Sequence, residues 1–132
     1  MKNFGVFALL ALIVSGCAMD ATVRSKASEL PGTYYSGDHL GRNVTVVLEP
    51  DGTYSSEWDG CLGFYGKSIG VWQVRGESLE FSPLSAESDL AGYLTQATTI
   101  QHDGRLGFAR SQDIKHDRVN ERLLFLKQES SP

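Results

Sequence analysis

The stretch NVTVVLEPDGTYSSEW, covering Asn43–Trp58, constrains the fold more than any other part of the chain. Its first half places apolar side chains at every second position, at Val44, Val46 and Leu48. That period is typical of a β-strand with one buried face. Pro50 then presets one backbone angle, and the Asp-Gly pair after it tolerates positive φ, which favours a tight turn. Because alternation resumes after the turn, the stretch predicts an antiparallel hairpin.

The same pattern of short strands and turn residues recurs along the chain. Further strands are predicted at Gly32–Ser36, Ser68–Val74, Ser78–Ser82, Tyr93–Gln101, Arg105–Arg110 and Glu121–Gln128, with tight turns at Arg75–Glu77 and His102–Gly104. We therefore predict an all-β chain, an antiparallel meander of about eight strands closed into a small barrel, because closure removes exposed strand edges. An open, highly curved sheet is the alternative. One short helix is allowed around residues 85–94, with Ser85 as its N-cap.

The N-terminus has the layout of an export signal. Lys2 is followed by the apolar run Phe4–Val14, which is only about half of the roughly 20 residues that cross a bilayer. The next residues, Val14-Ser15-Gly16-Cys17, resemble the lipobox of bacterial lipoproteins. That resemblance implies cleavage before Cys17, a diacylglyceryl group on its sulfur and an acyl group on the new amino terminus. An ordinary leader with a coincidental cysteine is the alternative.

These signals divide the chain into four parts. We predict a lipoprotein signal peptide at 1–16, a lipidated tether at 17–29, the barrel domain at 30–128 and a tail at 129–132. The residue after the lipidated cysteine is Ala18, and in lipoproteins the lack of Asp there implies the outer membrane, facing the periplasm. The formal net charge of −4 comes with no basic stripe, so nucleic acid is not an expected partner.

Three stretches carry a second resemblance. LPGTYYSG, VTVVLEPDGTYSSEW and GVWQVRGESLEFSP, within Leu30–Pro83, resemble small bacterial lipocalin-like barrel proteins. The matching positions are Gly32 and Tyr34 in the opening motif, Asp51, Gly52 and Tyr54 at the turn, and Gly70 and Trp72 in the later strand. The resemblance implies a barrel able to hold a small ligand. The Cys-x-x-Cys pair of copper-responsive envelope lipoproteins with such barrels is absent, so that role does not transfer.

Cys61 is the residue with the most reactive chemistry. If Cys17 is lipidated, an internal disulfide between the two cysteines is excluded, and Cys61 is an odd thiol in an oxidising compartment. It is expected to be a small buried residue in a Gly-rich turn with a bulge. The alternatives are an intermolecular or redox role, or a nucleophile activated by His39, His102 or His116.

The candidate ligand-binding residues are aromatic. They are Tyr34, Tyr54, Trp58, Trp72, Phe81 and Phe108, which line a ligand cavity or fill the barrel as its core. No metal site is predicted, because His102 with Asp103 and His116 with Asp117 are adjacent pairs, whose side chains diverge on a strand. These pairs fit a turn and a solvated loop. No cofactor and no catalytic residue is predicted.

Three functions remain open on this sequence. The leading hypothesis is a non-enzymatic, lipid-anchored periplasmic barrel that binds a small apolar ligand or an envelope partner. The alternative is a protein-interaction or inhibitor module of the lysozyme-inhibitor kind, for which the Ser36-Gly37 dipeptide is a weak signal and whose paired cysteines are missing. A thiol-dependent enzyme using Cys61 is the third.

Overall fold

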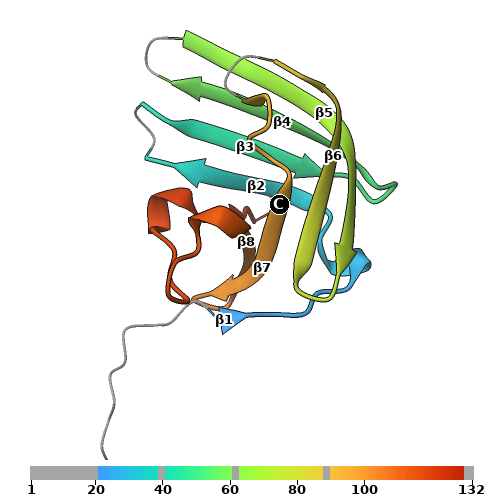
Figure 1. The fold of residues 1–132 in the computed structure, drawn as a ribbon, viewed down its shortest axis with the longest axis vertical. Coiled ribbons are helices and arrows are strands. Elements are labelled where there is room, and N and C mark those ends of the chain that lie inside the picture. Colours follow the sequence, from blue (N-terminus) through green and yellow to red (C-terminus); the bar gives the residue numbers. More distant parts are fainter. Residues whose placement is uncertain (1–20, 39–40, 61–62, 88–89, 130–132) are drawn as a thin grey trace, which may run out of the picture.

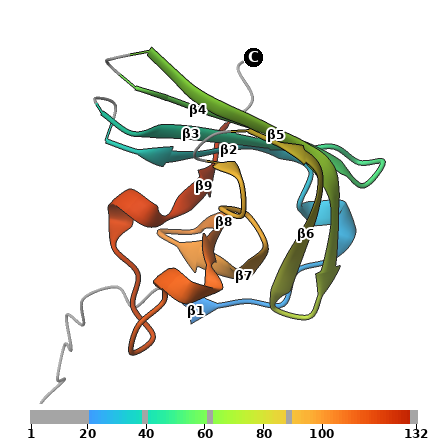
Figure 2. The ribbon, with the colours of Figure 1, turned by 45° about the horizontal axis from the view of Figure 1, so that its top comes forward.

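The protein is a closed antiparallel β-barrel. The computed structural model describes residues 21–38, 41–60, 63–87 and 90–129. Eight strands follow one another in sequence order round the barrel (Figures 1 and 2), which confirms the predicted all-β meander. They are β2 (Gly32–Gly37), β3 (Asn43–Leu48), β4 (Thr53–Gly60), β5 (Gly63–Arg75), β6 (Ser78–Ala86), β7 (Gln96–His102), β8 (Arg105–Arg110) and β9 (Phe125–Lys127).

A short N-terminal segment closes one end of the barrel. Strand β1 (Ala21–Thr22) pairs with β7 at Ile100 and Gln101, beyond the residues of β7 that pair with β6. The 3-10 turn η1 (Ala27–Glu29) follows, and Leu30 is then fully buried, with its carbonyl accepting a hydrogen bond from Tyr34 Oη at 2.6 Å. We call this the closed end; it also contains the turns β3–β4, β5–β6 and β7–β8. Part of the expected tether therefore lies on the barrel.

The C-terminal connection leaves the barrel at the opposite end, which we call the mouth end. Between β8 and β9 the chain forms two 3-10 turns, η3 (Ser111–Asp113) and η4 (Glu121–Leu123). This segment packs against the outer wall, where Ile114, Val119 and Leu126 contact a small second core of Ile100, Ala109 and Leu124. The predicted long C-terminal strand is therefore reduced to the three residues of β9.

The turns at the closed end have the predicted chemistry. In the β3–β4 turn, Asp51 Oδ1 accepts hydrogen bonds from Thr53 Oγ1 at 2.6 Å and from the Thr53 amide at 2.9 Å. These bonds hold the pKa of Asp51 below its ordinary value. The β7–β8 turn has positive φ at both central residues, Asp103 and Gly104, as a two-residue hairpin loop requires.

The short helix allowed around residues 85–94 is wrong, because the described residues of this range, 85–87 and 90–94, contain no α-helix. Ser85 and Ala86 belong to β6, where they pair with β5, because β5 extends far enough to offer them partners. The described residues after them form turns, and Leu90 and Leu94 are buried in the core. The strand predicted from Tyr93 begins only at Gln96, because Leu94 before it turns into the core at the mouth end.

The bulge expected in the Gly-rich region is present as a register shift of β4 against β5 after Trp58.

Closure of the barrel rests on a close backbone approach. β9 has two residue pairs with β2 and two with β8. A Cβ atom on Gly107 would lie 2.4 Å from the Phe125 carbonyl oxygen, well inside contact distance. Only glycine therefore allows β8 and β9 to come together at this position.

We predict that Gly107→Ala lowers the free energy of unfolding by about 2 kcal/mol, because the strands must separate to admit the methyl group. Urea denaturation followed by tryptophan fluorescence measures the loss. Gly41→Ala is the matched control, because no described atom lies within 4 Å of its added Cβ. Equal stability of the two variants would contradict the role of Gly107 in closure.

The hydrogen bonds of Asp51 in the β3–β4 turn predict that the stability of the fold depends on pH. Because folding lowers the pKa of Asp51, its carboxylate contributes stability above the ordinary value of 3.8 and loses it as pH falls through the folded pKa. The melting temperature of Asp51→Ala should lie below that of the wild type at neutral pH, and the gap should narrow in acid. Thermal unfolding between neutral and strongly acidic pH measures the gap; a gap independent of pH would refute the assignment.

Candidate functional site

Most of the aromatic residues predicted to bind a ligand pack against one another as the barrel core. Phe108 is central: its ring centroid lies 5.0 Å from that of Tyr34, 5.7 Å from Phe81 and 4.8 Å from Phe125, which it stacks against. Tyr54 meets Phe81 edge-on at 5.0 Å. Burial raises the pKa of both tyrosines, so both remain neutral. Ligand binding by these side chains stays a prediction.

Trp72 faces a cleft on the outside of the closed end. Trp72 is 7% exposed, and its Nε1 donates a hydrogen bond of 3.0 Å to the Glu49 carbonyl, which fixes the indole. The cleft has a volume of about 700 Å³. Its lining includes Pro31, Pro50, Trp72 and Val74, which come from the three stretches that carry the lipocalin-like resemblance. We call it the Trp72 cleft.

Trp58 lies at the opposite end of the barrel, beside Tyr93. The two ring centroids are 5.3 Å apart. The guanidinium carbon of Arg42 lies 5.6 Å from the Trp58 ring and 5.8 Å from the Tyr93 ring, within the range of a cation–π contact. The two tryptophans of the chain therefore have separate surroundings, one at each end.

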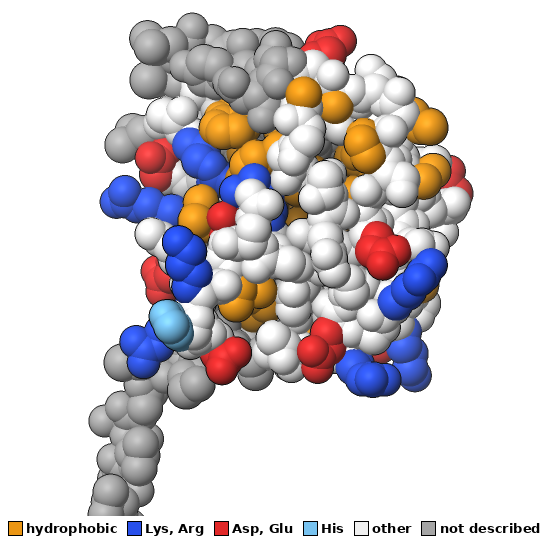
Figure 3. Space-filling model, viewed as in Figure 1, with side chains coloured by type: hydrophobic (Ala, Val, Ile, Leu, Met, Phe, Trp, Pro, Cys, Tyr) orange, Lys and Arg blue, Asp and Glu red, His pale blue; other side chains and the backbone are white. Residues whose placement is uncertain are grey.

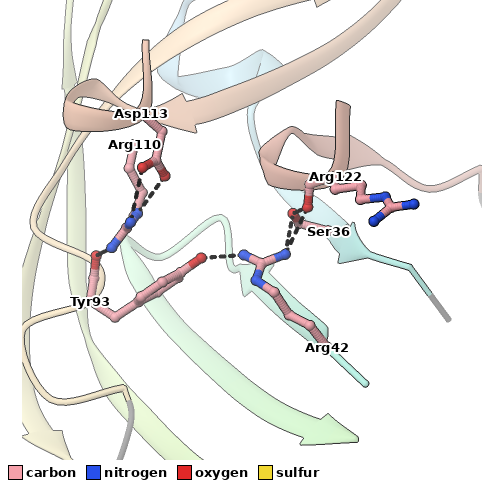
Figure 4. Close-up of polar contacts among 6 residues, drawn as sticks. All are labelled: Ser36, Arg42, Tyr93, Arg110, Asp113 and Arg122. Carbon is pink, nitrogen blue, oxygen red and sulfur yellow. Dashed lines mark hydrogen bonds and ion pairs between the residues drawn. The ribbon is translucent and has the colours of Figure 1, made fainter. Parts of the chain in front are cut away.

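Arg42 links the strands at the mouth through hydrogen bonds (Figure 4). Its Nη1 donates to Ser36 Oγ at 3.0 Å and to the main-chain carbonyl of Arg122 at 2.8 Å, while Nη2 donates to Tyr93 Oη. Ser36 Oγ donates to the same Arg122 carbonyl at 3.0 Å. Ser36 is buried, so this hydroxyl depends on these partners.

A second arginine holds Tyr93 from its other side. Arg110 forms a bidentate pair with Asp113, with nitrogen–oxygen distances of 2.7 and 3.0 Å, and its guanidinium carbon lies 4.0 Å from the Tyr93 ring centroid. Burial lowers the pKa of Arg110, but the hydrogen bonds that Arg110 donates to Asp113 and the charges of Tyr93 and Asp113 outweigh burial, so the pKa rises. Arg110 therefore stays charged.

These contacts form one unit, the mouth network, comprising Ser36, Arg42, Tyr93, Arg110, Asp113 and the Arg122 carbonyl. The unit ties β2 and the β2–β3 loop to the β6–β7 connection, η3 and η4. No spacing in the sequence indicated it, because Arg42 and Arg122 meet only through the fold. On the left of the face drawn in Figure 3, where η3 and η4 lie, Lys and Arg side chains are interspersed with Asp and Glu.

The mouth network borders a pocket on the outer wall of about 470 Å³. This seam pocket follows β9, where the barrel closes. Its lining residues are Tyr35, Ser36, Gly37, Asp38, His102, Arg105, Glu121, Arg122, Leu124, Leu126 and Gln128. Ser36 and Arg122 belong to both the pocket and the network. The network therefore fixes η4, which carries one wall of the pocket.

Arg105 lines the seam pocket and is partly buried. Its Nη2 donates to the Lys127 carbonyl at 2.6 Å, while its Nε is buried and no described acceptor bonds it. An unpaired buried donor costs about 1–3 kcal/mol, and such donors are rare in folded proteins, so the unbonded Nε marks Arg105 as a candidate functional residue. His102 lies nearby in the lining, 3.4 Å from Asp103 between Nε2 and Oδ2.

The other histidines and cysteines singled out in the sequence form no site among the described residues. His116 and Asp117 are exposed in a turn bridged by Lys115 and Arg118, as the solvated loop predicted. Cys17, His39 and Cys61 lie outside the described residues. In the described part of the chain, no three His, Cys, Asp or Glu residues lie close enough to hold a metal ion. Within the same ranges, no helix has the length and apolar character to cross a membrane.

Comparison of the chain with models of protein families, with curated proteins and with solved structures finds no match.

We predict that Arg42→Ala lowers the free energy of unfolding by about 2 kcal/mol, because it leaves buried Ser36 and the Tyr93 hydroxyl short of a partner. Hydrogen exchange should also accelerate in η4. Arg122→Ala is the control: its exposed side chain can be removed without touching the carbonyl that accepts the bonds, so a change within about 0.5 kcal/mol is expected. Similar losses in both variants would show that the network does not hold η4.

Proposed function

We propose that the protein is a lipid-anchored binding protein of the outer membrane, facing the periplasm, that takes a small ligand in the seam pocket rather than inside the barrel. One observation carries the proposal: the pocket gathers charged, aromatic and aliphatic groups on the outer wall, while the interior is filled by packed rings. Its volume of about 470 Å³ lies in the range of small-molecule sites. Binding is proposed rather than catalysis because the Ser36 hydroxyl in the lining donates its hydrogen bond to the Arg122 carbonyl and not to a base.

The lining favours a ligand with one acidic group and a compact apolar body. Leu126 and Tyr35, which are partly buried, line the pocket, and Arg105 supplies a fixed cation. Arg guanidinium groups recognise carboxylate and phosphate oxygens through paired donors. Asp38 and Glu121 in the same lining disfavour polyanions, so a single acid group is the better fit.

A second candidate is binding of an envelope protein through the outer face of β5 and β6. Ile69, Val71 and Leu84 are 52%, 43% and 78% exposed there, and hydrophobic side chains gather at the upper right of Figure 3, over these strands. Exposed apolar groups of this kind occur at interaction sites. The inhibitor variant built on Ser36-Gly37 has less support, because Ser36 is buried and its hydroxyl is bonded within the mouth network.

The test is native mass spectrometry of the lipoprotein purified from its own envelope in mild detergent. Wild type should carry a small acidic adduct that Arg105→Met loses, because the methionine keeps the stem but not the charge. Arg118→Met is the matched control, since Arg118 is exposed and does not line the pocket. No adduct on wild type, or an adduct on Arg105→Met, would refute the pocket. A co-purifying protein lost in Leu84→Glu would instead support the β5–β6 face.

A further inference from the structure

The chain enters the barrel at the closed end, and it enters close to the proposed lipid. β1 begins at Ala21, which pairs with Gln101 beside the β7–β8 turn. Only residues 18–20 separate Ala21 from Cys17. Fully extended, such a span bridges about 14 Å, so the lipidated residue and the closed end cannot lie far apart.

The segment after Ala21 is held firmly to the barrel. The Val23 amide donates to the Thr99 carbonyl at 3.1 Å, and the Ser25 amide donates to the Gly76 carbonyl at 3.3 Å. Thr99 Oγ1 bonds the Val23 carbonyl in return. The attachment point is therefore part of the closed end, and the slack between lipid and domain is limited to residues 18–20.

The two ends differ in what they present to a neighbouring surface. The closed end carries the Trp72 cleft with Pro31 and Pro50, and the exposed cations Arg24 and Lys26 next to the entry point. The mouth end lies one barrel length away, because the eight residues of β4 span roughly 26 Å. The mouth network therefore lies away from the bilayer when the barrel stands on its closed end.

We propose that the closed end, with the Trp72 cleft, lies against the lipid surface, and that the short tether imposes this orientation. The inference rests on lipidation of Cys17, as in the proposed function. The partner of this end is the bilayer, whose headgroup region meets the Trp72 cleft, with its prolines and Asp51, and the cations of residues 24–26. The mouth end faces away from the membrane.

The two tryptophans test the orientation, because one marks each end. The lipoprotein is reconstituted in vesicles of phosphatidylethanolamine and phosphatidylglycerol that contain a nitroxide-headgroup phospholipid. Trp58→Phe leaves only Trp72, and Trp72→Phe leaves only Trp58. Quenching of Trp72 should be several-fold stronger than quenching of Trp58. A variant with a long Gly-Ser insert after Ala18 should lose most of this difference, because its tether no longer restrains the domain.

The outcomes separate the two proposals. Failure of the lipoprotein to enter the vesicles would overturn the proposed anchor. Entry with equal quenching of the two rings, or with stronger quenching of Trp58, would overturn the orientation alone. If the insert variant kept the same difference in quenching between Trp72 and Trp58, the short tether would not be the cause of the orientation. Hydrogen exchange of the unsubstituted lipoprotein gives an independent reading: vesicles should protect residues 24–29 and the β3–β4 turn, and leave η4 unchanged.

Discussion

The pairing of β9 with two neighbours at once is the constraint on which the rest of the structure depends. Three residues bridge β2 and β8, and they convert an open meander into a barrel. The aromatic core is enclosed only because this bridge exists, since Phe125 of β9 stacks on Phe108 of β8. The seam pocket also lies along β9, so the same strand closes the barrel and forms part of the proposed binding site.

A filled interior changes where binding is expected. In a barrel of eight strands the inside is just wide enough for side chains or one small ligand. Here Tyr34, Phe81 and Phe108 take that space, and Leu90 and Leu94 are buried with them. Outside this core, the outer wall and the two ends offer the surfaces on which the proposals of binding are built. The mouth network and the Trp72 cleft give those ends different surfaces.

The hairpins followed from sequence because their determinants are local. The alternation of Val44, Val46 and Leu48 matches their burial, and the Pro-Asp-Gly turn forms where it was predicted. The helix at residues 85–94 failed because pairing with the far part of β5 decided the conformation of Ser85. The mouth network had no local signal at all, since Arg42 and Arg122 become neighbours only once the barrel is closed.

The seam also determines how such a chain must fold. Tyr34 pairs with Lys127, so closure joins segments that are distant in sequence and incurs a large entropy of loop formation. Until that step, β2 and β8 present unpaired edges that can recruit strands from other copies. We therefore expect closure to be a slow step of folding, and aggregation to compete with folding until it is complete. Substitutions that weaken β9 would lower the yield of folded protein before they lower the stability of the finished barrel.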